Sequence, residues 1–361
     1  MIFNELKYPW LAATAITGGW SSGVEQSNAT ATNATTIEGQ PWWKEGWSLE
    51  GQEKIGSARD ELELYGAVAF PGFLTQDAVE SAVDEMLTRE DNAFTTNTEH
   101  TAYLNHDDYD FPPDSIYHHR TKTIVASTAY DELSEDSVLK QLYTDPRLLK
   151  FVSSIVLPDE QDEESSKLYL SEDPLGCCSV NVFRPGYFHG LHYDESEFSV
   201  TLMLQDAEDP RSGLFQYTEP IRTKILPNET SAEDDPSGLT LGLRETADVF
   251  RRHEHDAGAS SIPQDRKKFA EPHLHLDEHH FGLQTLDFRP GTLLVLAGSR
   301  SLHRVTAVKG NRSRFVAVLT FARRPGFCNT PEVQEMFWGR TGNATSNNCR
   351  TEEQLQECEA R

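Results

Sequence analysis

The sequence has few basic residues for its length, and this limits the partners that it can have. Lysine and arginine total 32 against 58 aspartate and glutamate residues, so the 361-residue chain carries a formal net charge of −26. This acidic balance disfavours contact with a nucleic-acid backbone or with an anionic membrane surface. We therefore expect neither nucleic acid nor membrane as a partner. Composition leaves the oligomeric state unknown.

Long apolar runs and cysteines are also scarce. No run of apolar residues is long enough to cross a bilayer, and the N-terminus lacks a basic stretch followed by a continuous apolar segment, which predicts no signal peptide. Five cysteines are an odd number for a secreted disulfide framework, and the adjacent Cys177 and Cys178 could bridge each other only with strain. We interpret these two as reduced thiols and predict a cytoplasmic protein.

The composition changes along the chain and divides it into five parts. The Ser/Thr/Asn-rich start of the chain predicts a mobile arm. The next segment has helical periodicity, and after it come short strand patterns separated by Gly/Pro turns. We predict an N-terminal arm at 1–48, a helical flank at 49–158, a β-rich core at 165–325 with an irregular insertion at 223–282, and a C-terminal tail at 326–361. The flank, insertion and core make one domain, 49–325. Many short strands indicate a sandwich or jelly roll, so the fold class is mainly β with flanking helices.

The flank itself contains three helical patterns and one irregular stretch. Helices are predicted from about Gly51 to Leu64, after a candidate N-cap at Thr75, and from a candidate N-cap at Ser134 to Leu157. Residues 90–120 are polar with scattered aromatic side chains, a composition typical of a lid or a binding loop.

Within the core, His192 and Asp194 form a His-x-Asp pair at the mouth of an alternating strand. Residues i and i+2 of a strand point to the same face, so the imidazole and the carboxylate lie side by side. Alone this pair is a weak signal, because it is frequent in exposed polar turns. A second histidine, His303, follows a Pro-Gly-Thr-apolar strand and a small loop, as a ligand on a later strand would. Two histidines and one carboxylate that leave coordination positions open are the facial triad of non-haem Fe(II) oxygenases.

Two arginines follow the second histidine. Arg314 opens the next strand and could hold an acidic co-substrate through a bidentate pair. Arg312 is the alternative, because it lies two residues earlier and would therefore share the same strand face.

Three stretches of the chain resemble the Fe(II)/2-oxoglutarate-dependent dioxygenases. They are Asn181-x-x-Arg-Pro-Gly, His192-Tyr-Asp194-x-Ser-x-Phe-x-Val-Thr-Leu-Met-Leu-Gln and Leu302-His-Arg-Val-Thr-x-Val-x-Gly. The resemblance covers roughly residues 60–325. It is closest to a branch of fungal and bacterial oxygenases that also contains amino-acid halogenases. It implies a double-stranded β-helix core and Fe(II), 2-oxoglutarate and O2 as cofactor and co-substrates.

The same resemblance assigns roles to residues. It implies that His192, Asp194 and His303 bind iron, and that Arg314, or else Arg312, pairs with the distal carboxylate of 2-oxoglutarate. Asn181 could bond to 2-oxoglutarate or to the metal carboxylate. Halogenases of this type carry a small residue in place of that carboxylate, whereas this chain keeps an aspartate, which predicts oxygenation.

The resemblance implies hydroxylation of a small molecule such as an amino acid or a secondary metabolite, with release of succinate and CO2. Alternatives are a hydroxylase of protein side chains, a non-catalytic jelly-roll binding module and a zinc hydrolase with the same ligands. A binding module would lack a ligand, and a hydrolase would need a separate general base.

Further polar residues are candidates for the substrate pocket, although a surface or structural role is equally common for each. They are His189 and Glu195 beside the His-x-Asp pair, and His118, His119 and Arg120 in the polar stretch. The histidines between 253 and 280 lie in a charged region without a zinc-binding pattern, so we interpret that region as an exposed insertion.

Overall fold

The computed structural model describes residues 52–104, 119–157, 167–196, 198–221, 246, 249–250 and 282–342. The predicted arm at 1–48 and nearly all of the insertion at 223–282 lie outside these ranges. The described residues belong to one compact unit, Pro41–Arg361. Within them, no helix combines the length and the apolar character that a bilayer crossing requires.

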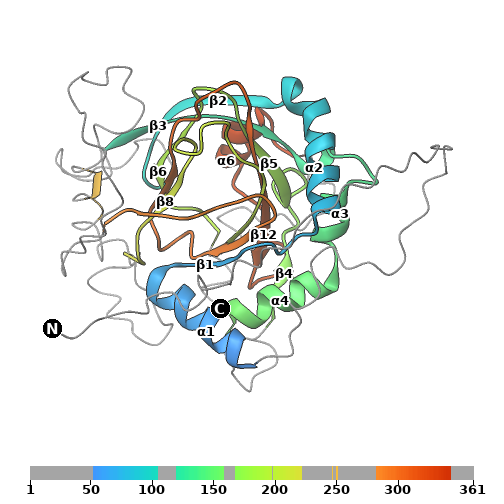
Figure 1. The fold of residues 1–361 in the computed structure, drawn as a ribbon, viewed down its shortest axis with the longest axis vertical. Coiled ribbons are helices and arrows are strands. Elements are labelled where there is room, and N and C mark those ends of the chain that lie inside the picture. The colour runs from blue at the N-terminus through green and yellow to red at the C-terminus, as the bar shows by residue number, and fades with distance from the viewer. Residues whose placement is uncertain are drawn as a thin grey trace, which may run out of the picture. The chain divides into compact units, whose positions relative to one another are not determined.

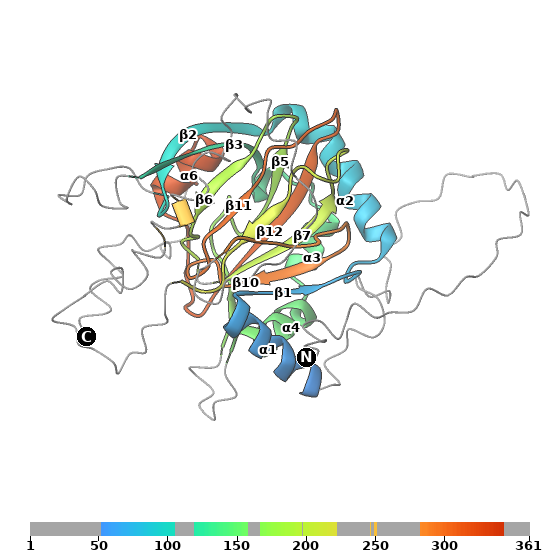
Figure 2. The same ribbon diagram turned by 60° about the vertical axis from the view of Figure 1, so that its left-hand side comes forward.

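Two antiparallel sheets form the core (Figures 1 and 2). Among the described residues, the larger sheet has eight strands in the order β1-β10-β7-β12-β5-β3-β2, with β4 paired to β12, and the smaller has the order β6-β11-β8-β9. The strands of the larger sheet are β1 (Ala67–Phe70), β2 (Phe94–Thr101), β3 (Arg120–Thr128), β4 (Tyr169–Leu170), β5 (Cys178–Phe183), β7 (Ser199–Gln205), β10 (Leu293–Leu296) and β12 (Arg314–Ala322). The smaller sheet contains β6 (His189–His192), β8 (Phe215–Tyr217), β9 (Gln284–Thr285) and β11 (His303–Val305).

The sheets are arranged as in a jelly roll, with one cavity lined from both of them. A bridge between Ile124 and Phe188 connects them at one edge. This arrangement confirms the predicted mainly β fold with flanking helices.

The central strands β5, β7, β10 and β12 of the larger sheet are buried on both faces, which explains why they are so apolar. Along β12, Arg314, Val316 and Val318 line the cavity, whereas Phe315 and Leu319 point the other way into the main hydrophobic core. This alternation is the period of two expected of a strand. Helices cover the outer face: α1 (Gln52–Tyr65), α2 (Gln76–Arg89), α3 (Val138–Tyr143) and α4 (Pro146–Val156), of which α1 and α4 lie side by side in Figure 1.

The helix boundaries follow their capping residues. Thr75 caps α2 as predicted, because its hydroxyl accepts the N–H of Ala78. The single helix predicted from Ser134 is wrong, since the segment forms two helices. Ser137 caps α3, and Asp145 caps α4, whose first residue is Pro146. A proline biases the residue before it away from helical geometry, so the chain breaks there and starts a new helix.

The polar stretch at 90–120 also differs from the expected irregular loop. After a 3-10 turn at Glu90–Asn92, residues Phe94–Thr101 form β2, which pairs along its whole length with β3. Threonines recur in β2 at 95, 96, 98 and 101, and threonine favours strands. The flank therefore contributes three strands to the larger sheet, and β2 and β3 bring buried polar side chains close to the cavity. Residues 105–118 lie outside the described ranges.

The described cysteines fall into two states. Cys177 and Cys178 are free and buried, as predicted. Cys328, in contrast, is disulfide-bonded. Disulfides persist in oxidising compartments and are rare in the cytosol, so this finding runs against the predicted cytoplasmic location.

The two free thiols should be unreactive in the folded protein. Burial raises the pKa of Cys177 to about 12 and that of Cys178 well above its usual value. Because the thiolate is the reacting form, we expect a short pulse of iodoacetamide at pH 8 to alkylate both at least ~100-fold more slowly than in urea. Peptide mass spectrometry resolves the two sites from the other cysteines, and equal rates with and without urea would contradict the buried placement.

Candidate metal centre

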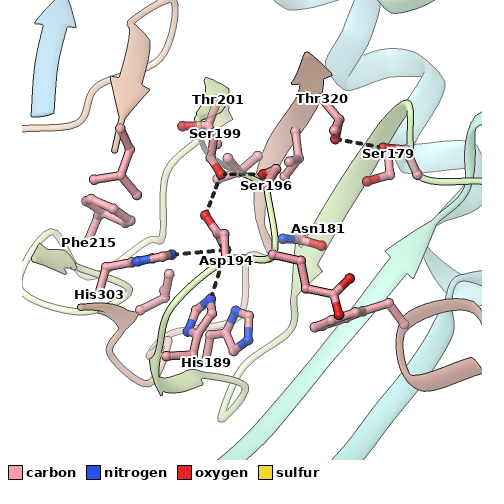
Figure 3. Close-up of a pocket in the computed structure, with 18 of the residues that line it drawn as sticks. Ser179, Asn181, His189, Asp194, Ser196, Ser199, Thr201, Phe215, His303 and Thr320 are labelled. Carbon is pink, nitrogen blue, oxygen red and sulfur yellow. Dashed lines mark hydrogen bonds and ion pairs between the residues drawn. The ribbon is translucent and has the colours of Figure 1, made fainter. Parts of the chain in front are cut away.

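His192, Asp194 and His303 meet at the cavity, at the ends of two paired strands. His192 ends β6, and His303 begins β11 directly opposite it in the antiparallel register. Asp194 follows β6, and its backbone N–H donates to the carbonyl of Gly298 at 3.0 Å. Its Oδ1 lies 3.5 Å from His192 Nε2 and 3.4 Å from His303 Nε2, and Figure 3 shows His303 pointing toward Asp194. One ligand atom from each of the three residues lies within 4.8 Å of the others, and of these residues Figure 3 labels Asp194 and His303.

Hydrogen bonds fix which ring nitrogen each histidine offers. His192 Nδ1 lies 2.8 Å from the carbonyl of Gly190, and His303 Nδ1 lies 2.9 Å from the carbonyl of Ser301. A carbonyl only accepts, so Nδ1 carries the hydrogen in both rings and Nε2 is left for a metal. The Ser199 hydroxyl donates to Asp194 Oδ2, which leaves Oδ1 facing the two imidazoles.

A glycine makes room for the carboxylate. A Cβ at Gly298 would lie 2.2 Å from Asp194 Oδ2, closer than two atoms can approach. Residue 298 must therefore lack a side chain if the carboxylate is to stand where it does. Nothing in the sequence between β10 and β11 pointed to this contact.

The electrostatics favour the ligand form of His192 and Asp194, whereas His303, whose pKa is raised, would release a proton when a metal binds. Burial lowers the pKa of His192, which favours the neutral imidazole. Burial alone would raise the pKa of Asp194, but its contacts with His303 and His192 outweigh this, and the pKa lies well below the usual range. Burial alone would lower the pKa of His303, but the neighbouring Asp194 carboxylate has the larger combined effect, and the pKa is raised. Two imidazole nitrogens and one ionised carboxylate fit a divalent transition metal.

Arg314 is a buried cation in the same cavity. It begins β12, opposite Phe183 of β5, and is 1 % exposed. Its guanidinium lies over the rings of Phe183 and Phe288, at 5.2 and 5.9 Å from their centroids, and its Nε and Nη1 have no hydrogen-bond partner among the described residues. Burial lowers its pKa to about 9, against a small opposing effect of Asp206. A desolvated guanidinium with unsatisfied donors requires an anionic ligand.

Arg312 lies elsewhere. Its Nη2 pairs with Asp206 at 2.8 Å at a half-exposed position, and it is not among the residues that line the cavity with the triad. The expectation that it shares a strand face with Arg314 is wrong, because β12 begins only at Arg314.

Of the other predicted residues, Asn181, His189 and Glu195 line the cavity. Asn181 accepts the Ser127 hydroxyl at 3.0 Å. The His189 ring stacks on that of His192 with centroids 3.7 Å apart, and its Nε2 is buried without a partner among the described residues.

Two more of the predicted residues lie away from it. His119 packs against Phe250 at 5.0 Å between centroids, and Arg120 is exposed at the start of β3. His118 and the histidines between 253 and 280 lie outside the described residues.

A helix in the predicted tail forms one wall of the cavity; the sequence allowed a terminal helix there but gave no sign that it would line the site. Helix α6 (Pro331–Trp338) is capped by Thr330, and its Val333, Phe337 and Trp338 line the cavity. Glu195 anchors its start, because Thr330 donates its hydroxyl to one carboxylate oxygen at 3.1 Å and its N–H to the other at 3.4 Å. Thr330-Pro331 is a helix-start signal, and Val333 and Phe337 have helical spacing. The helix could therefore be predicted from the sequence, but its position against the cavity could not.

Comparison with known proteins adds a likeness in fold. No family model and no curated protein matches the sequence. Similar solved structures include an oxidoreductase of the 2OG-Fe(II) oxygenase family from Burkholderia pseudomallei, with 14% identity, a TM-score of 0.39, and 77% of this chain and 93% of that one covered. Others are a prolyl-4-hydroxylase from Pseudomonas putida (12%, 0.38, 75% and 99%) and HygX from Streptomyces hygroscopicus with nickel and 2-oxoglutarate bound (14%, 0.41, 74% and 86%). With identities and TM-scores this low, function is inferred below from the chain's own residues.

Proposed function

We propose that the chain is an Fe(II)- and 2-oxoglutarate-dependent dioxygenase that hydroxylates an unactivated C–H bond of a small molecule. The observation that carries this proposal is that one cavity holds both the convergent triad and a buried, unsatisfied guanidinium. A metal with open positions and an anion-binding arginine together match a metal-chelating dicarboxylate co-substrate. A zinc hydrolase would have no use for the arginine, and a binding module would not need the full ligand set.

His192, Asp194 and His303 would hold the iron, and the carbonyls behind both histidines keep the rings aimed at it. Arg314 would bind the distal carboxylate of 2-oxoglutarate through its planar fork, between the two phenylalanine rings that exclude water. When bound, iron with 2-oxoglutarate and O2 supplies the oxidising power for C–H cleavage, with succinate and CO2 as co-products.

The substrate would bind where α6 lines the cavity. The cavity holds about 150 Å³, and its lining includes apolar Val333, Phe337 and Trp338 together with polar Glu195 and Asn329. An enclosed, largely apolar lining with a few polar groups is typical of small-molecule sites, and it supports a small substrate.

Anaerobic titration of the apo-protein with Fe(II) and 2-oxoglutarate tests the proposal. We expect a weak visible charge-transfer band that needs both additions and saturates at one equivalent of each, because the triad and Arg314 share one cavity. Succinate release in air would then be screened against amino acids and other small metabolites. Iron that binds without a band on adding 2-oxoglutarate would refute the co-substrate, and the hydrolase reading would replace the oxygenase.

A further inference from the structure

We propose that His100 and Thr123 are positioning residues for the metal ligand His192, acting through the backbone of Gly190, whose N–H and C=O lie in the two peptide groups on either side of its Cα. This inference rests on the metal centre proposed above. His100 lies on β2 and Thr123 on β3, so both belong to the larger sheet, whereas His192 lies on β6 of the smaller one. The two sheets are thereby joined by hydrogen bonds directly behind the metal ligand.

The connection is a continuous series of hydrogen bonds. His192 Nδ1–H donates to the carbonyl of Gly190 at 2.8 Å, and the N–H of Gly190 donates to Thr123 Oγ1 at 3.1 Å. Thr123 Oγ1 lies 2.7 Å from His100 Nε2, and His100 Nδ1 lies 2.7 Å from the carbonyl of Thr101. The last contact lies within β2, and the other three link the outer strand β2 to the imidazole that would bind iron.

The proton positions follow from the last of these contacts. The carbonyl of Thr101 only accepts, so His100 Nδ1 carries the hydrogen, and Nε2 of the neutral ring accepts from the Thr123 hydroxyl. Thr123 therefore donates to His100 and accepts from Gly190 with one oxygen. A hydroxyl is the only small group that does both, and serine keeps this function whereas valine loses it.

The environment of the series leaves no room for water or for movement. Thr123 is 0 % and His100 1 % exposed. A Cβ at Gly190 would lie 2.0 Å from Thr121 Oγ1 and 2.5 Å from the carbonyl of Lys122, so only glycine lets β6 approach β3 this closely. A lost partner in such a place leaves buried polar groups unsatisfied, and the Gly190 peptide would shift to compensate.

Ring contacts hold His192 from further sides. The His189 ring stacks on it at 3.7 Å with planes 22° apart, and the His100 ring meets it edge to face at 6.4 Å. His100 thus touches the ligand through space as well as through Thr123 and Gly190. The alternative is a purely structural role, in which His100 packs in the core and its hydrogen bonds stabilise the fold without affecting metal affinity.

The test compares two substitutions at one position. Thr123→Val keeps the shape of the side chain and suits a strand, and Thr123→Ser keeps the hydroxyl. In the anaerobic Fe(II) titration at saturating 2-oxoglutarate, we expect Thr123→Val to weaken Fe(II) binding about tenfold or more, the usual effect of removing a partner behind a metal ligand. Thr123→Ser should restore binding to within roughly threefold of the wild type.

Thr98→Val is the matched control, because Thr98 lies directly opposite Thr123 in the β2–β3 pair but outside the series. It should leave Fe(II) affinity unchanged. The thermal midpoint of each apo-protein is measured alongside, since a purely structural role would lower the midpoint without a selective loss of metal affinity.

If Thr123→Val fails to fold, His100→Phe replaces it, because it keeps an aromatic ring in the core and removes both hydrogen bonds. It should weaken Fe(II) binding to a similar degree. Wild-type affinity in a folded Thr123→Val or His100→Phe protein would overturn the inference while leaving the proposed function intact. A wild type that binds no Fe(II) would instead refute the proposed function itself.

Discussion

Replacing Asp194 with alanine should abolish the Fe(II)/2-oxoglutarate band and product formation together. Its Oδ1 is the atom that faces both ligand nitrogens, at 3.5 and 3.4 Å, and it is the one carboxylate in the convergent group. Without it, two neutral imidazoles would have to hold the cation alone. Loss of a residue behind a ligand costs 10–100-fold in metal affinity, so loss of the ligand itself should cost more than about 100-fold.

The measurement is the anaerobic titration, followed by succinate release in air. Asp287→Ala is the matched control, because that carboxylate is exposed and pairs only with Arg289 in the contacts described, at 2.6 Å. It should titrate like the wild type. The apo-form of Asp194→Ala should remain folded, which circular dichroism checks. A normal band or normal product formation by a folded Asp194→Ala protein would remove this aspartate from the metal centre.

The triad could be predicted from sequence because strand geometry is short-range. His192 and Asp194 are two positions apart, and a later strand that begins at His303 pairs directly with the first. The alternating apolar pattern around both segments was enough to predict two strands, and only antiparallel pairing was needed to join them. The choice between Arg314 and Arg312 depended on where β12 begins, and element boundaries are the least certain part of any sequence reading.

The remainder of the site depends on long-range packing that no local pattern encodes. Helix α6 has an ordinary capping signal, but only the folded chain shows that Phe337 reaches the His189 ring, 5.8 Å away between centroids. His100 looked like part of a polar loop, because β2 is short of apolar residues and is stabilised by its pairing with β3. Gly298 likewise shows its function only through the distance to Asp194.

Fold and site are connected through the two sheets. The smaller sheet carries both histidines of the triad, and the larger sheet carries the arginine, so the cavity exists only while the sheets keep their spacing. Gly190 helps to set this spacing, because a Cβ there would lie 2.5 Å from the carbonyl of Lys122 on β3. The strands β2 and β3, predicted to belong to a helical flank, thus pack beside the strand that carries His192.

Replacing Arg314 with alanine should weaken 2-oxoglutarate binding strongly and leave iron binding nearly unchanged. Arg314 is the only arginine or lysine among the described residues that line the cavity. A bidentate pair supplies two charge-assisted hydrogen bonds, each worth about 1.5–3 kcal/mol. Because every 1.4 kcal/mol is about tenfold, the dissociation constant for 2-oxoglutarate should rise by roughly 100-fold or more. The variant should fold, since the change also removes an unpaired buried charge.

Two further variants test whether the effect is specific to Arg314 and to the shape of its guanidinium. Arg312→Ala should leave 2-oxoglutarate binding at the wild-type level, because Arg312 is bonded to Asp206 outside the cavity. Arg314→Lys should fall between wild type and Arg314→Ala, since lysine keeps a positive charge but cannot form the planar fork. The readout is the 2-oxoglutarate concentration at half-maximal band intensity, with Fe(II) binding measured separately by equilibrium dialysis. If Arg312→Ala raises that concentration and Arg314→Ala does not, the buried guanidinium has another ligand, and the co-substrate binds beside Arg312, outside the cavity.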